Sequence, residues 1–166
     1  MNEESRFGGY YRWGLVLGFV LFPAPVFALL ISLSFESIPG SVPLAGAGGN
    51  TATLNFGRVS AFEPLNTGVN RTVGASSYTI STRFGVRATH LLGGILTPNY
   101  TLRARLQSGS ALAWQIDGMT MSTSPVTFAP SQPYGPVVPH TLAFVVPFSH
   151  PAGPVTTVFE VTAIAN

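Results

Sequence analysis

Two stretches of the chain alternate apolar and polar residues with a period of two, and this pattern restricts the fold more than any other feature. In the first stretch, one side of the chain carries Tyr78, Ile80, Thr82, Phe84, Val86 and Ala88. In the second, one side carries Tyr100, Leu102, Ala104 and Leu106. Because successive side chains of a strand point to opposite faces of a sheet, each stretch predicts a strand with one buried and one wet face. Four arginines fall on the wet faces, where we expect them to solvate the sheet: Arg83, Arg87, Arg103 and Arg105.

Turn and strand signals continue to the C-terminus. Asp117-Gly118 separates two short runs and predicts a hairpin, because a type I′ turn needs positive φ at both central residues. We therefore interpret Asp117, the only aspartate, as a turn residue rather than a catalytic acid. Repeated prolines predict that Ser124–Pro139 is an edge or crossover segment. Residues 140–146 predict a buried strand, and residues 155–165 predict a strand covered on both faces.

No helical pattern of useful length follows the N-terminal region, so the sequence predicts an all-β protein. Several short strands separated by turn signals favour an antiparallel, immunoglobulin-like β-sandwich over 51–166, with a barrel as the second choice. Residues 29–50, of which 39–49 are rich in Gly, Ala and Pro, are expected to form an extension or linker before this domain.

The N-terminal region has the order of a secretory signal. An apolar run from Leu15 to Phe22 is followed by helix-breaking prolines and small residues up to Ala28, which predicts a signal peptide over 1–28. The alternative is an uncleaved hydrophobic anchor helix over 15–31, with prolines in the middle of its span. Either interpretation predicts a protein that is secreted, periplasmic or on the cell surface. Contact with a membrane is expected only through this segment, if it is uncleaved.

Composition excludes several classes of partner and site. The 166 residues include 8 basic and 6 acidic side chains, and no cysteine, which rules out a disulfide framework and a cysteine metal site. The arginines are scattered rather than clustered, so no nucleic-acid partner is expected. A net charge of +2 permits association, and lysine, a common guard of exposed sheet edges, is absent.

Both ends of the domain resemble a known family. Thr53-Leu54-Asn55-Phe56-Gly57, followed by Glu63-Pro64-Leu65, is similar to the opening of spore coat U and chaperone–usher pilin domains. The strand with Leu142 and Phe144, the Pro151-Ala152-Gly153 loop and the final strand through Val161 resemble their last hairpin. The resemblance implies a secreted immunoglobulin-like sandwich that assembles into surface fibres or coats. Those domains commonly carry a disulfide, which this chain cannot form.

One short segment has the pattern of an assembly strand. Ile31, Leu33 and Phe35 alternate with polar residues, and the 39–49 linker follows them. Such a strand could add to the open sheet edge of a neighbouring molecule. The alternatives are the first strand of the same domain, or the tail of an uncleaved anchor.

The sequence offers few candidate residues for catalysis. We expect His90, His140 and His150 to lie at the surface or in turns, and no carboxylates occur as a close pair. Trp114, Tyr100 and Tyr134 could form a sugar-binding platform, although Trp114 shares the apolar side of its run and is expected in the core.

The sequence thus predicts a non-catalytic exported structural or surface-assembly protein, not an enzyme, with no cofactor or metal. Its expected partner is itself or another surface protein. The alternative is a secreted monomeric binding module for a carbohydrate or other small ligand.

Overall fold

A computed structural model describes residues 31–46, 49–90 and 98–166, and the predicted signal or anchor helix at 1–28 lies outside them. Sheet A contains β1 (Ile31–Glu36), β4 (Asn70–Val73), β5 (Ser77–His90), β7 (Ala113–Ile116), β8 (Met119–Thr120) and β10 (Val138–Pro147). Sheet B contains β2 (Leu44–Ala45), β3 (Thr51–Val59), β6 (Asn99–Leu106), β9 (Val126–Pro133) and β11 (Gly153–Ala165). In this part of the chain, no helix is long and apolar enough to span a bilayer.

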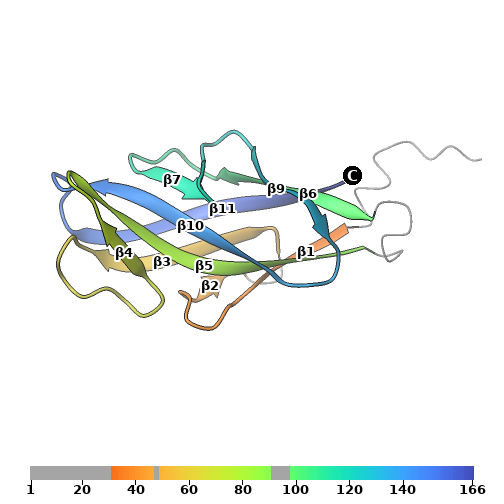
Figure 1. Cartoon of the computed structure of the whole chain (residues 1–166), viewed down its shortest axis with the longest axis horizontal. Coiled ribbons are helices and arrows are strands. Elements are labelled where there is room, and N and C mark those ends of the chain that lie inside the picture. Colours follow the sequence, from red (N-terminus) through yellow and green to blue (C-terminus); the bar gives the residue numbers. More distant parts are fainter. Residues whose placement is uncertain (1–30, 47–48, 91–97) are drawn as a thin grey trace, which may run out of the picture.

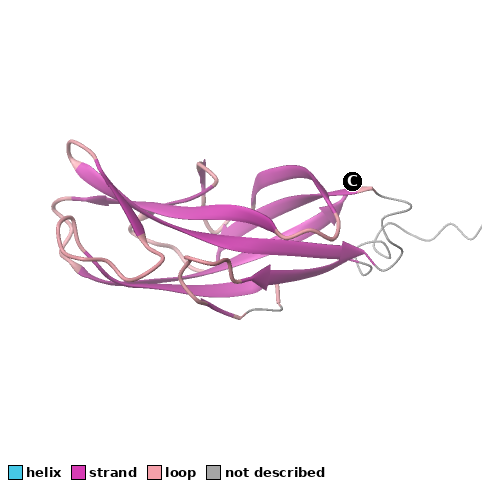
Figure 2. Cartoon of the chain, turned by 60° about the horizontal axis from the view of Figure 1, so that its bottom comes forward, coloured by secondary structure: helices cyan, strands magenta, loops and turns pink. Residues whose placement is uncertain are grey.

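The two sheets are antiparallel and pack face to face as a sandwich (Figure 1, Figure 2). Sheet A has the order β1-β5-β10-β7-β8, with β4 also paired to β5, and sheet B has the order β2-β3-β11-β6-β9. The long strands β5, β10 and β11 run along the molecule. The β3–β4 and β10–β11 loops lie at one end, and the C-terminus lies at the other (Figure 1).

The predicted alternation is confirmed. All of Tyr78, Ile80, Thr82, Phe84, Val86 and Ala88 are buried on β5, as are the four apolar residues of β6. The four arginines of these strands are exposed. The inward-facing side chains form one core, in which aromatic rings make edge contacts across the sheets, such as Phe84–Phe159 at 5.3 Å and Phe56–Phe144 at 4.9 Å. Such pairs add about 0.5–1.5 kcal/mol to the stabilisation from area burial.

The predicted hairpin and edge segment are also confirmed. Asp117 and Gly118 have φ of 47° and 81° between β7 and β8, as a type I′ turn requires. The proline-rich β9 forms one edge of sheet B and pairs only with β6. At such an edge, a missing proline N–H can face away from the ladder.

A bulge explains the Leu-Asn-Phe-Gly segment of β3. The register with β11 shifts between Val155 and Thr156, and Gly57 takes a left-handed φ of 68° beside the shift. The Gly57 N–H donates to Asn55 Oδ1 (2.9 Å), and a Cβ at Gly57 would lie only 2.0 Å from Asn66 Nδ2. The position therefore requires glycine both for conformation and for space.

Two expectations differ from the structure. The prediction that β11 is covered on both faces is wrong, because Val158 and Ile164 are 37% and 42% exposed on its outer face. The strand is central in its hydrogen-bonded sheet, but the molecule has only two layers, so one face stays wet. The segment 29–50, expected as an extension or linker, contributes β1 and β2 to the two sheets.

Candidate functional site

The candidate assembly strand, β1, lies within the chain's own sheet A. It pairs antiparallel with β5, from Ile31 opposite His90 to Glu36 opposite Gly85. Phe35 is 2% exposed and packs against the rings of Phe84 (5.9 Å) and Phe159 (5.4 Å). In this arrangement the segment is the first strand of its own domain. Its use by a neighbouring molecule stays a prediction.

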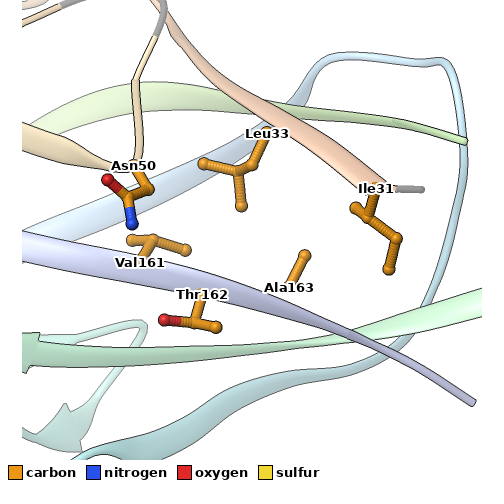
Figure 3. Close-up of a pocket in the computed structure, with 6 residues that line it drawn as sticks. All are labelled: Ile31, Leu33, Asn50, Val161, Thr162 and Ala163. Carbon is orange, nitrogen blue, oxygen red and sulfur yellow. The ribbon is translucent and has the colours of Figure 1, made fainter. Parts of the chain in front are cut away.

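Ile31 and Leu33 are only partly buried, because they border an open groove between the two sheets. Figure 3 shows their side chains pointing from β1 toward β11, where Val161 and Ala163 point back. The groove has a volume of about 250 Å³. Its lining consists of Ile31, Leu33, Asn50, Val161, Thr162 and Ala163. No charged side chain of the described residues lines it, so an apolar segment could enter without desolvating an ion.

The C-terminal part of β11 has an open hydrogen-bonding edge beside this groove. Its ladder with β3 ends at Glu160 opposite Thr51, followed by one bond from the Val161 N–H to Asn50 O (2.8 Å). In an antiparallel ladder, alternate residues direct their backbone groups to opposite neighbours. Ala163 and Ala165 therefore direct their N–H and C=O groups to the side away from β6, where no described strand pairs with them.

The carboxylates of the described residues are all engaged elsewhere. Glu160 binds Arg105 (2.6 Å) on the outer face of sheet B, and Glu63 binds Arg58 (2.9 Å). Glu36 lies 3.6 Å from Arg87. The Glu63 and Glu36 pairs are exposed and contribute little stability each, whereas the Glu160 side chain is 17% exposed in its pair. The described residues of the groove thus offer apolar contact and backbone hydrogen bonds.

Sequence reasoning missed a polar pair that joins a buried histidine to a partly exposed aspartate. His140 was expected at the surface or in a turn, but it is 4% exposed, and its Nδ1 lies 2.6 Å from Asp117 Oδ2. Asp117 Oδ1 also accepts the Thr141 N–H at 2.7 Å. Burial alone would raise the pKa of Asp117, but the hydrogen bonds from His140 and Thr141, together with the His140 charge, hold it below its ordinary value. Asp117 is thus both a turn residue and an anchor for β10.

The placement of the other two histidines is mixed. His90 is 7% exposed at the end of β5, against the ring of Tyr134, so its predicted surface position is wrong. His150 is exposed in the β10–β11 loop, as expected. In the described parts of the chain, no three His, Asp or Glu residues are grouped as metal ligands.

The aromatic trio considered for sugar binding does not form a surface. Trp114 is 2% exposed, packs on Phe144 (4.4 Å) and donates from Nε1 to Ser110 Oγ (2.9 Å). Tyr100 is fully buried, and its ring lies 4.9 Å from that of Tyr134. Trp114 and Tyr100 therefore belong to the core.

Comparison with other proteins adds no assignment. No family model matches the chain, and no curated protein does so either.

Proposed function

We propose that this protein is a non-catalytic, exported surface-assembly subunit with an immunoglobulin-like fold. It associates with copies of itself, or with another surface protein, through an open strand edge and apolar contacts. The observation that carries the proposal is the C-terminal edge of β11, with which no described strand pairs, beside a groove that no charged side chain of the described residues lines. The resemblance of the chain ends to pilin-like domains supports the same assignment.

The edge and the groove suit one kind of partner, an extended segment. Such a segment would pair with the backbone groups of Ala163 and Ala165 and place alternate side chains between Leu33 and Val161. Each hydrogen bond gained contributes about 0.5–1.5 kcal/mol net, and the buried apolar area adds more. A residue pattern like that of 31–35 from a second molecule would meet these requirements.

The surface supports association in a second way. Exposed sheet edges are usually protected by lysine or by inward-pointing charges, and the chain has no lysine. A net charge of +2 gives little repulsion between copies. A charge added in the groove should therefore oppose association, as a lysine on an exposed sheet edge does.

The test compares Ala163→Lys with Ile164→Lys in the processed protein. Ala163 lines the groove, whereas Ile164 is exposed on the opposite face of the same strand, so both variants add one charge at nearly the same place. Size-exclusion chromatography with light scattering, followed by electron microscopy, should show concentration-dependent oligomers or fibres for wild type and Ile164→Lys. Ala163→Lys should remain monomeric at concentrations about tenfold higher. Because Ala163 is partly buried, a melting curve of each variant checks that it is folded at the temperature of the assay.

Two results would contradict the proposal. A wild-type protein that stays monomeric at every concentration, alone and with its surface partners, has no assembly role. Equal association of the two lysine variants would show that contacts form elsewhere.

A further inference from the structure

A pocket of about 470 Å³ lies at the end of the sandwich that carries the β3–β4 and β10–β11 loops, opposite the C-terminus. We call this end the loop end. The lining of the pocket comes from the β3–β4 loop, the start of β5 and the β10–β11 loop (Figure 1). The lining residues are Ser60, Ala61, Phe62, Tyr78, Phe148, His150 and Ala152. The volume falls within the range of about 300–1,000 Å³ typical of small-ligand sites.

Three aromatic rings lie one after another along this pocket, those of Phe62, Phe148 and Tyr78. The Phe62 and Phe148 rings lie 6.2 Å apart and 9° from parallel, and the Tyr78 and Phe148 rings lie 6.0 Å apart and 29° from parallel. Phe62 is 82% exposed and Phe148 is 39% exposed. An apolar ring with so much exposure contributes little to the core, so stability alone does not account for its position.

The loop that presents Phe62 is held by side chains. Ser60 Oγ accepts the backbone N–H groups of Phe62 and Glu63, both at 3.3 Å. Arg71 Nη1 donates to Ser60 O (2.7 Å) and to Glu63 O (2.8 Å). The ring is therefore presented by an ordered loop, and a ligand would not have to supply the free energy of ordering it.

Among the described residues, the lining of the pocket supplies no arginine or carboxylate as an ion-pair partner for a ligand. No charged side chain is among its lining residues in the described chain, Arg71 is turned to backbone carbonyls, and Glu63 is paired with Arg58. The parallel rings also differ from the crossed faces of a cage that surrounds a cation. A neutral ligand fits this environment best.

The polar groups of the lining indicate which class of neutral ligand the pocket can bind. The Tyr78 hydroxyl and the His150 imidazole each combine donor and acceptor capacity, and the Ser60 hydroxyl, which already accepts two backbone N–H groups, can still donate. Sugar hydroxyls also donate and accept, and the C–H face of a sugar ring packs on an aromatic face. A proline-rich peptide, by contrast, presents mainly carbonyl acceptors.

We propose that this pocket binds a neutral saccharide, with sugar rings against Phe62 and Phe148 and sugar hydroxyls bonded to Ser60 and His150. The site lies at the opposite end of the molecule from the β1–β11 groove, so saccharide binding does not depend on the assembly role. It differs from the predicted platform of Trp114, Tyr100 and Tyr134, two of which are buried.

The test applies the processed protein to an array of neutral and anionic glycans, and titrates the strongest glycan calorimetrically. We expect binding to neutral glycans. Phe62→Ala should lower the affinity about tenfold or more without changing the melting temperature, because the ring is exposed. Ile164→Ala removes an exposed apolar side chain at the other end of the molecule and should leave the affinity unchanged.

Three outcomes would overturn the inference: no neutral glycan binds, Phe62→Ala binds as tightly as wild type, or decaproline binds in preference to every glycan. Because Ala163→Lys should weaken assembly about tenfold and still bind saccharide, failure of the two proposals can be distinguished.

Discussion

Replacing Asp117 by Asn should destabilise the protein through one buried contact. The substitution keeps the turn, since Asn tolerates left-handed φ, and its amide oxygen can still accept the Thr141 N–H. What is lost is the negative charge 2.6 Å from Nδ1 of His140, a ring that is 4% exposed. Hydrogen bonds to charged groups contribute about 1.5–3 kcal/mol and neutral ones about half of that, so we expect a loss of about 0.7–1.5 kcal/mol.

The assay is urea unfolding of wild type and Asp117→Asn at pH 7, repeated at pH 5 and pH 3. The pKa of Asp117 is lowered in the folded state, so its contribution is fully present above the unfolded pKa, about 3.9, and is lost as the pH falls through the folded pKa. The difference in unfolding free energy should therefore hold at pH 5 and shrink at pH 3.

The same substitution in a His140→Leu variant isolates the Asp117–His140 contact. With His140→Leu, the charge has no buried partner, so Asp117→Asn should cost less than in wild type. An equal cost in both backgrounds, or a difference that stays constant down to pH 3, would refute the reasoning.

Three further substitutions test the packing. Gly57→Ala should lower the unfolding free energy by more than ~1 kcal/mol, because alanine is strained at φ 68° and its Cβ would collide with the Asn66 amide; a thermal melt that matches wild type would contradict this. Phe84→Ala should cost about 3–5 kcal/mol by removing a fully buried ring, whereas Arg105→Ala should cost at most ~1 kcal/mol, because its ion pair with Glu160 lies at the surface. Similar losses for these two variants in chemical denaturation would show that the core is not packed as described.

Local patterns in the sequence were sufficient to predict much of the fold. The alternation in β5 and β6 depends only on strand geometry, and the Asp117-Gly118 turn depends only on backbone conformation. Those features are properties of neighbouring residues, so no tertiary information was needed.

Features that depend on distant pairing were harder to predict. The outer face of β11 carries the apolar Val158 and Ile164 beside Glu160, and only the number of layers decides that these two side chains are exposed. The His140–Asp117 pair joins residues 23 positions apart. A lone Asp at a turn and a His at the start of a strand give no signal of contact until the β7–β10 register is known.

The candidate site shows the same division. The sequence indicated a strand at Ile31, Leu33 and Phe35, but not that it would pair with β5. The open edge at Ala163 exists because β3 ends its pairing at Thr51, five residues before β11 ends. Strand lengths in three dimensions, rather than residue types, create that edge.

The sequence by itself determined an all-β chain with alternating strands, sparse charge and turns at defined places, because these follow from side-chain chemistry over a few residues. The tertiary structure alone decided which faces are covered, which edge is free, and which aromatic rings are exposed at the loop end. Burial and edge pairing depend on segments brought together from far along the chain, and both proposed surfaces arise from that juxtaposition.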